Sequence, residues 1–148
     1  MKEIKIRVKR VGGFSGRLPQ YKTAGSAGVD LTAHLERSLS IRPMERVLIP
    51  TGIAVEIPEG YEGQVRPRSG LALKHGITTV NTPGTIDSDY RGEIGVIMVN
   101  LGDTPFDMNP GDRIAQLVIS PVVHLVWEDV DELTDTERGE GGFGSSGK

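Results

Sequence analysis

Short runs in which apolar and polar residues alternate constrain this chain more than any other feature of its sequence. In residues 4–9, Ile4, Ile6 and Val8 alternate with charged residues, and residues 29–35 repeat the pattern. A period of two places successive side chains on opposite faces of a strand, so that one face can be buried. Each of these runs therefore predicts a half-buried β-strand.

The other candidate strands are equally short, and turn residues separate them. They lie at residues 47–49, 53–57, 95–100, 114–119 and 122–127. Turn signals fall between them at Pro50-Thr51-Gly52, Pro58-Glu59-Gly60, Pro83-Gly84, Asn109-Pro110-Gly111-Asp112 and Ser120-Pro121. About ten short strands with such punctuation are typical of an all-β sandwich or barrel.

One segment departs from this β pattern. Residues 71–75 are good helix formers, Ser69 is placed to cap the start of a helix, and Gly76 is placed to end it in the left-handed conformation. The sequence therefore predicts a single short helix near residues 70–75.

Composition narrows the classes of function. The chain has 148 residues, no Cys and only three His, at positions 34, 75 and 124. Disulfides, thiolate chemistry and the usual closely spaced zinc ligands are therefore excluded. Aromatic residues make up only 5% of the chain, so the core should consist of Val, Ile and Leu.

Charge and hydropathy indicate where the protein acts. Seventeen Lys and Arg against 20 Asp and Glu give a net charge of −3, which provides no overall basic field for nucleic acid. No apolar run has the length of a signal peptide or a membrane span. We expect a cytoplasmic protein with neither a membrane nor a nucleic acid as its partner.

The last twelve residues, 137–148, differ from the rest of the chain. They contain five Gly, two Ser and no aliphatic side chain, so they cannot bury enough apolar surface to become ordered by themselves. A solvated tail is one interpretation. Arg138 and Phe143 favour another, a flap that closes over a flat, charged ligand. The chain thus divides into a β domain, residues 1–136, and a flexible Gly-rich tail.

Two segments carry residues suited to phosphate chemistry. Residues 66–70, Arg-Pro-Arg-Ser-Gly, precede the expected helix and combine guanidinium groups, a hydroxyl and backbone N–H groups, which together suit an anion. An ordinary helix cap with two solvated arginines is the alternative. In residues 87–92, Asp87 and Asp89 can share one face, and a carboxylate near a polyphosphate can deprotonate water.

Five segments in this order resemble the five motifs of the trimeric deoxyuridine triphosphate nucleotidohydrolases (dUTPases). They are Ala24-Gly25-Ser26-Ala27-Gly28-Val29-Asp30-Leu31, Arg66–Gly76, Asn81–Glu93, Gly111-Asp112-Arg113-Ile114-Ala115-Gln116-Leu117, and Arg138–Gly147. Any one of these motifs would be weak support, but the five together extend over nearly the whole chain.

The resemblance implies a fold and a quaternary structure. The family fold is a jelly-roll-like β barrel of short strands with one short helix. It assembles as a homotrimer with three active sites at subunit interfaces, so that isolated subunits should be inactive. The implied reaction is hydrolysis of dUTP to dUMP and pyrophosphate, which lowers dUTP and supplies dUMP for thymidylate synthesis.

The resemblance also implies roles for individual residues. Asp87 would be the general base that activates water for attack on the α-phosphorus, and the Tyr90 ring would exclude a ribose 2′-hydroxyl. Asn81, Gly84 and Gly95 would bind uracil in a tight β-hairpin with no space for a thymine methyl group. The other substrate-binding residues implied are Arg68, Ser69, Gly70, Thr85, Ile86, Gln116, Arg138, Phe143, Gly144 and Ser145. Asp30 would be a structural or interface residue that supports the site.

Magnesium is expected because of charge rather than because of a ligand motif. A triphosphate carries about four negative charges near neutral pH and needs a counter-ion. The resemblance implies Mg²⁺ held mainly by the substrate phosphates, so no protein metal ligand is named.

Two other functions compete with dUTP hydrolysis. Deoxycytidine triphosphate deaminases share the fold implied here, and a non-catalytic nucleotide-binding trimer is the second alternative. A deaminase needs a group that activates water at C4 of the base, usually a Glu in those relatives. A non-catalytic trimer would be expected to lack Asp87 or Arg138, and both are present. The sequence therefore favours the hydrolase.

Overall fold

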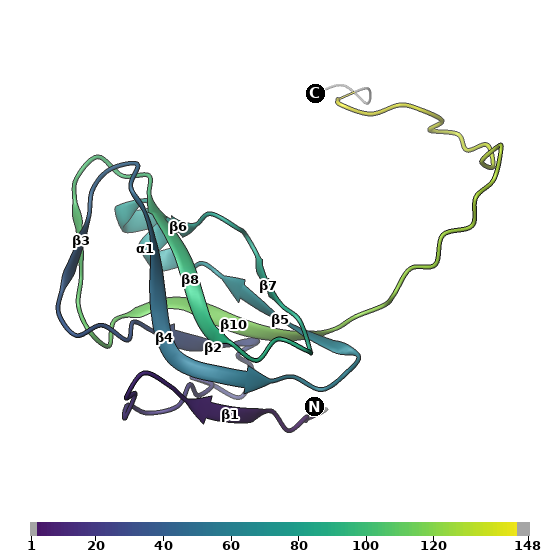
Figure 1. Ribbon diagram of the computed structural model, residues 1–148. Helices are drawn as coiled ribbons and strands as arrows, with labels where there is room; N and C mark the ends of the chain where they lie inside the picture. The colour runs from purple at the N-terminus through teal and green to yellow at the C-terminus, as the bar shows by residue number, and fades with distance from the viewer. Residues whose placement is uncertain (1–2, 145–148) are drawn as a thin grey trace.

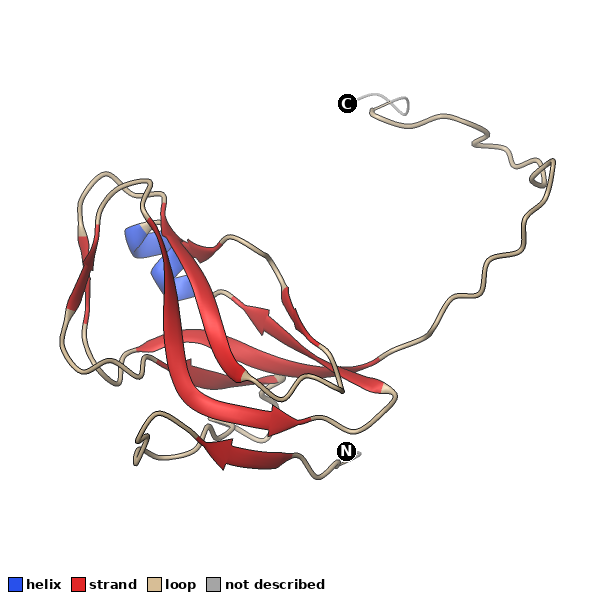
Figure 2. Ribbon diagram, in the orientation of Figure 1, coloured by secondary structure: helices blue, strands red, loops and turns tan. Residues whose placement is uncertain are grey.

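The alternating runs form short strands in the computed structural model, which describes residues 3–144 (Figure 1). Ten strands and one helix occur in this part of the chain, and strands dominate the ribbon (Figure 2). Their bounds are β1 Arg7–Arg10, β2 Gly28–Thr32, β3 Leu39–Ile41, β4 Arg46–Glu56, β5 Tyr61–Arg66, α1 Ser69–His75, β6 Ile77–Thr79, β7 Gly84–Ile86, β8 Glu93–Asn100, β9 Phe106–Met108 and β10 Arg113–Pro121. The all-β prediction with a single short helix is confirmed.

The strands pair in two four-stranded sheets and one small ribbon. The first sheet has the order β1-β4-β8-β6, the second has the order β2-β10-β5-β7, and β3 pairs with β9. All of these pairs are antiparallel. The arrangement is jelly-roll-like, as predicted, although the pairings between residues 3 and 144 do not close a continuous barrel.

The core is aliphatic, as the low aromatic content predicts. Its largest fully buried apolar side chains are Leu31, Ile41, Ile49, Ile77, Ile94, Val96, Met98, Met108 and Ile114. Phe14, Tyr61 and Phe106 pack against this cluster from its edge and remain partly exposed. The inward residues of the predicted strands thus form a core that joins both large sheets.

The turn predicted at Pro50-Thr51-Gly52 is wrong. Residues 46–56 form one continuous strand, β4, and the pairing register with β8 shifts between Pro50 and Ala54. Gly52 lies within this irregularity at φ +74°, a conformation that favours glycine. The turn residues therefore make a bulge inside a strand instead of a chain reversal.

The first and the last of the predicted strands also differ from the structure. The first strand is displaced to Arg7–Arg10, where all four residues are exposed on an edge beside β4. The predicted break at Ser120-Pro121 lies at the end of β10, and residues 122–127 do not form a strand. Val123 and Val126 in this segment are more than 90% exposed, because no strand within residues 3–144 pairs with them.

The helix is confirmed, but its N-cap differs from the prediction. Ser69 is the first residue of α1, and Arg68 occupies the N-cap position without a side-chain capping hydrogen bond. Gly76 ends the helix at φ +67°, and its N–H donates to the carbonyl groups of the last turn. The seven-residue helix, Ser69–His75, is too short to cross a membrane, and it is the single helix in the described part of the chain.

Candidate active site

A first pocket lies where the start of α1 meets β2 and β10. Its volume is about 330 Å³, and its lining is rich in polar and cationic groups. The residues that line it are Lys22, Ser26, Ala27, Gly28, Asp30, Arg68, Ser69, Gly70, Arg113 and Gln116. The predicted phosphate-binding residues Arg68, Ser69, Gly70 and Gln116 are thus brought together, and we call this cavity the cationic pocket.

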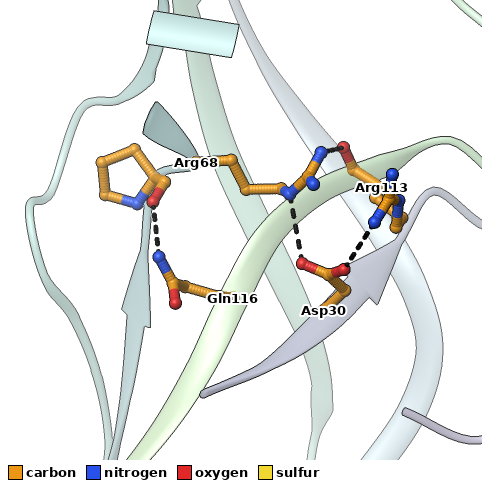
Figure 3. A network of polar contacts seen from close by, with 5 residues as sticks. Asp30, Arg68, Arg113 and Gln116 are labelled. Carbon is orange, nitrogen blue, oxygen red and sulfur yellow. Dashed lines mark hydrogen bonds and ion pairs between the residues drawn. The ribbon is translucent and has the colours of Figure 1, made fainter. Parts of the chain in front are cut away.

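Asp30 organises the cationic pocket by binding two arginines at once (Figure 3). The Arg68 Nε donates to Asp30 Oδ1 at 3.1 Å, and the Arg113 Nη1 donates to Asp30 Oδ2 at 3.1 Å. The Arg68 Nη1 also donates to the backbone carbonyl of Arg113 at 3.2 Å. One carboxylate therefore orients two guanidinium groups and leaves one positive charge uncompensated, which favours an anion.

Strand pairing places Gln116 in the same pocket. In β10, Gln116 lies opposite Asp30 of β2 on one side and opposite Arg66 of β5 on the other. Its side-chain amide donates to the Pro67 carbonyl at 3.1 Å (Figure 3). This contact ties β10 to the turn that leads into α1, and Ser69 and Gly70 remain exposed at the mouth of the pocket.

A second, larger pocket of about 850 Å³ contains the predicted general base. Asp87 follows β7 directly and is exposed, and the Tyr90 N–H donates to the Asp87 carbonyl at 3.2 Å to close the next turn. Asp89 lines the same pocket, but so does Ser88, because residues 87–90 form a turn instead of the extended chain that was expected. Three glutamates of the β4–β5 region, Glu56, Glu59 and Glu62, make its wall acidic. We call this cavity the acidic pocket.

Of the predicted uracil-binding residues, Gly84 lies on β7 and Gly95 on β8, in different sheets, and Asn81 lies in the loop between β6 and β7. Val80 donates its N–H to the Ile97 carbonyl at 2.9 Å, which holds the chain before Asn81 beside β8. The Asn81 side chain lies against Gly84, because a Cβ on Gly84 would be 3.0 Å from the Asn81 amide nitrogen. Gly95 has a close neighbour too, since a Cβ there would lie 2.7 Å from Leu48.

The tight hairpin expected around these residues is not formed by strand pairing. β7, which contains Gly84, Thr85 and Ile86, pairs with β5 in one sheet, whereas β8 pairs with β4 and β6 in the other. The chain between β7 and β8 crosses from one sheet to the other. Thr85 is exposed on β7, and Ile86 packs against the core.

The two pockets have no residue in common among the residues that line them. The predicted phosphate-binding residues and Asp87 are therefore divided between two cavities in a single chain, and the residues predicted to bind uracil and the sugar line neither cavity. The phosphate-binding group lies in the cationic pocket, and Asp87 lies in the acidic pocket. One chain by itself does not surround a ligand with both groups.

The predicted tail residues lie outside both pockets. After β10 the chain leaves the sheets: Val122 and His124 still line the acidic pocket, and the rest of residues 122–144 extends away from the domain (Figure 1). We call residues 122–144 the C-terminal arm. Arg138 donates to the Gly141 carbonyl at 2.7 Å within the arm, and Phe143 is fully exposed next to Gly144. Ser145, also predicted in the site, lies outside the described residues.

Comparison with known proteins decides the family. The family model described as dUTPase matches residues 15–147. The chain belongs to the dUTPase family. A deoxyuridine 5′-triphosphate nucleotidohydrolase from Syntrophotalea carbinolica is 58% identical over 147 residues, with 99% of each chain covered. One from Fusobacterium nucleatum subsp. nucleatum is 53% identical, with 100% of each chain covered.

Solved dUTPase structures share the fold. A Staphylococcus bacteriophage 80alpha dUTPase mutant with dUpNHpp has a TM-score of 0.87 and 29% identity, covering 97% of this chain and 99% of that one. A mutant dUTPase from phage phi11 of S. aureus, described with a structural Mg(II) ion, has a TM-score of 0.77 and 26% identity. The match covers 87% of this chain and 98% of the phage phi11 chain.

Four residues of the cationic pocket lie in dUTPase motifs but were not predicted in the site, namely Arg113 and the neighbouring Ser26, Ala27 and Gly28. Arg113 lies in the Gly111–Leu117 motif, lines the pocket and is paired with Asp30. Its partner is 83 residues away in sequence, so no local pattern indicates the pair. A search for basic residues in every family motif would have found Arg113.

Metal binding by the protein alone has no obvious place in the described part of this dUTPase. Between residues 3 and 144, no group of three or more His, Cys, Asp or Glu side chains is arranged to hold a metal ion. Asp87 and Asp89 both line the acidic pocket.

Proposed function

We propose that this chain hydrolyses dUTP to dUMP and pyrophosphate. The observation that carries the proposal is the match of the dUTPase family model to residues 15–147, which include every residue named for the site. The geometry supports it, because a pocket with excess positive charge and a separate exposed carboxylate provide the two functions that hydrolysis of a nucleotide anhydride requires.

Asp87 is the general base in this proposal. Its carboxylate accepts a proton from a water molecule, and the water oxygen bonds to the α-phosphorus. The bond between the α-phosphorus and the bridging oxygen to the β-phosphorus breaks, and pyrophosphate leaves with that oxygen. The exposure of Asp87 supports this role, since a solvent-facing carboxylate can contact water.

The cationic pocket binds the phosphates in this proposal. Arg68 donates from the nitrogens that Asp30 does not use, and Ser69, Gly70 and Gln116 supply further donors. Because Asp30 fixes the guanidinium before substrate arrives, little side-chain entropy is lost on binding.

Magnesium would accompany the triphosphate. The donor sets of the two pockets fit a cation held mainly by phosphate oxygens, because the cationic pocket suits the phosphates and the acidic pocket tolerates a positive charge. Bound Mg²⁺ supplies neutralisation of the phosphate charge.

The uracil and the sugar would be selected by exclusion. Asn81 and the backbone of Gly84 and Gly95 would bind the flat base and leave no space for a methyl group. Thr85 and Ile86 belong to β7, which leads directly into Asp87. The ring of Tyr90 would pack against C2′ of the deoxyribose and leave no space for a hydroxyl group.

Substituting Tyr90 with Ala should relax selection against ribose. Because the ring acts as a wall, its removal is expected to raise the ratio of kcat/KM for UTP to kcat/KM for dUTP by about 10-fold or more. Steady-state pyrophosphate release with both nucleotides measures this ratio. An unchanged ratio in a folded variant would contradict the steric role.

A homotrimer with shared sites would unite the two pockets. The division of the site residues in one chain supports this, since a neighbouring copy can bring its own acidic pocket to the cationic pocket. The C-terminal arm supports it as well, because Val123, Val126 and Trp127 leave large apolar surfaces exposed that a second copy would cover. Residues 137–148 would then close over nucleotide bound to a neighbouring subunit.

Sedimentation tests the trimer directly. At micromolar concentration the protein should sediment at about three times its chain mass of 16.0 kDa. Catalytic activity should be lost on dilution to the point where the trimer dissociates. A fully active monomer would overturn shared sites, although not the proposed reaction.

The reaction itself is tested with a panel of nucleotides. Release of pyrophosphate from dUTP, but not from UTP, dTTP or dCTP, would support the proposal. Release of ammonia from dCTP would identify a deaminase, and nucleotide binding without any product would identify a non-catalytic trimer.

A further inference from the structure

The ring of Tyr90 is exposed, yet two neighbouring residues fix its position. Its hydroxyl donates to the Glu93 carbonyl at 2.9 Å. The ring also lies over Gly92 so closely that a Cβ there would be 2.3 Å from the hydroxyl oxygen and 2.5 Å from Cζ. We infer that Gly92 and Glu93 are positioning residues that set sugar selectivity by fixing this ring, an inference that rests on the proposed function.

The Glu93 carbonyl, which accepts the hydrogen bond from the Tyr90 hydroxyl, is itself held in place by the contacts of its own residue and of the next one. The Glu93 carboxylate accepts a hydrogen bond from the Gly52 N–H at 2.7 Å. The Thr51 hydroxyl, in a residue only 2% exposed, donates to the carbonyl of Ile94 at 2.6 Å. The bulge in β4 therefore fixes the first two residues of β8, and with them the anchor of the ring.

A fixed ring matters because steric exclusion requires a wall that does not yield. Tyr90 is 43% exposed and stands on a turn between two sheets, where a side chain usually has several rotamers. Any rotamer that moved the ring away from the sugar would leave space for a 2′-hydroxyl. Contact with Gly92 on one side and the hydrogen bond to Glu93 together favour a single position.

Gly92 offers a test that leaves the backbone undisturbed. Its φ lies outside the left-handed region, unlike that of Gly52, so alanine is compatible with the backbone at this position. The three atoms nearest to an added methyl group, outside the residues next to Gly92 in the chain, all belong to the far end of the Tyr90 side chain. The ring must therefore move, and the fold need not.

The experiment compares kcat/KM for dUTP and UTP in Gly92→Ala and in the wild-type enzyme. We expect the UTP to dUTP ratio to rise by about 10-fold, with a melting temperature within about 2 °C of wild type. Gly25→Ala is the matched control, because Gly25 has an ordinary φ and open space at its Cβ position. Its ratio should equal that of wild type.

A double variant shows whether Gly92 acts through Tyr90. In the Tyr90→Ala background, adding Gly92→Ala should leave the ratio unchanged, since no ring remains to be displaced. Glu93 provides a second, independent pair of variants. Glu93→Gln keeps an oxygen that accepts from the Gly52 N–H and should preserve selectivity, whereas Glu93→Ala should raise the ratio in the same direction as Gly92→Ala.

The outcomes separate this inference from the proposed function. A wild-type enzyme without activity on dUTP would overturn both. If wild type hydrolyses dUTP and Tyr90→Ala relaxes selectivity, but a folded Gly92→Ala and a folded Glu93→Ala keep the wild-type ratio, the positioning role alone is overturned. An effect of Gly92→Ala that persists fully without the Tyr90 ring would also overturn it.

Discussion

Replacing Asp87 with Asn is expected to lower kcat for dUTP by about 100-fold or more, because an amide cannot accept the proton of the attacking water. Folding should be preserved, since the side chain is exposed and the substitution retains its size. The affinity for nucleotide should also remain, because the phosphate-binding groups lie in the cationic pocket. Single-turnover kinetics and equilibrium titration with a non-hydrolysable analogue measure the two effects separately.

Asp89 supplies the matched control for this substitution. It lines the same acidic pocket two residues away, and Asp89→Asn removes the same charge from it. A loss confined to Asp87→Asn would identify a specific base. Equal losses in the two variants would mean that the charge of the pocket matters and that neither carboxylate alone accepts the proton.

Removing residues 137–148 is expected to lower kcat/KM for dUTP by about 100- to 1000-fold while the folded domain persists. Arg138 and Phe143 belong to this segment and make no contact with either pocket in the single chain. Their contribution would arise only when the segment closes over bound nucleotide, excludes water and stabilises charge on the leaving pyrophosphate.

The melting temperature distinguishes this interpretation from a structural one. Without ligand it should barely change on truncation, because the deleted residues contain no aliphatic side chain and β10 already ends at Pro121. Retained activity would mean that residues 137–148 are only a solvated end of the chain with no role in catalysis. A large fall in the melting temperature would instead show that they stabilise the assembly. Phe143→Ala in the full chain tests the aromatic contribution alone.

Local patterns in the sequence predict the class of the fold and its single helix. Leu31, Ala33, Ile49, Ile53 and Val55 are all buried, as their alternation indicates, because a period of two determines which face of a strand is apolar. The end of α1 at Gly76 is equally local, since it depends on one residue adopting a left-handed conformation.

Three-residue strands and strand partners cannot be predicted in this way. β3, β6, β7 and β9 are too short to display a period, and each is defined by a partner more than ten residues away. Residues 122–127 show the opposite failure, because their apolar pattern resembles a strand but finds no partner within the described chain. Pairing is a property of two segments, so one segment does not determine it.

The sequence by itself determined the family, and it predicts the chemistry of the candidate site, because Asp87, Tyr90, Arg68 and Gln116 stand in motifs whose residue types suit a nucleoside triphosphate. Only the tertiary structure decided how these groups are distributed. Asp30 reaches Arg113 across 83 positions, and the turn signal at Gly52 became a bulge that anchors Glu93. Such contacts depend on the register between paired strands, which long-range packing of the core selects.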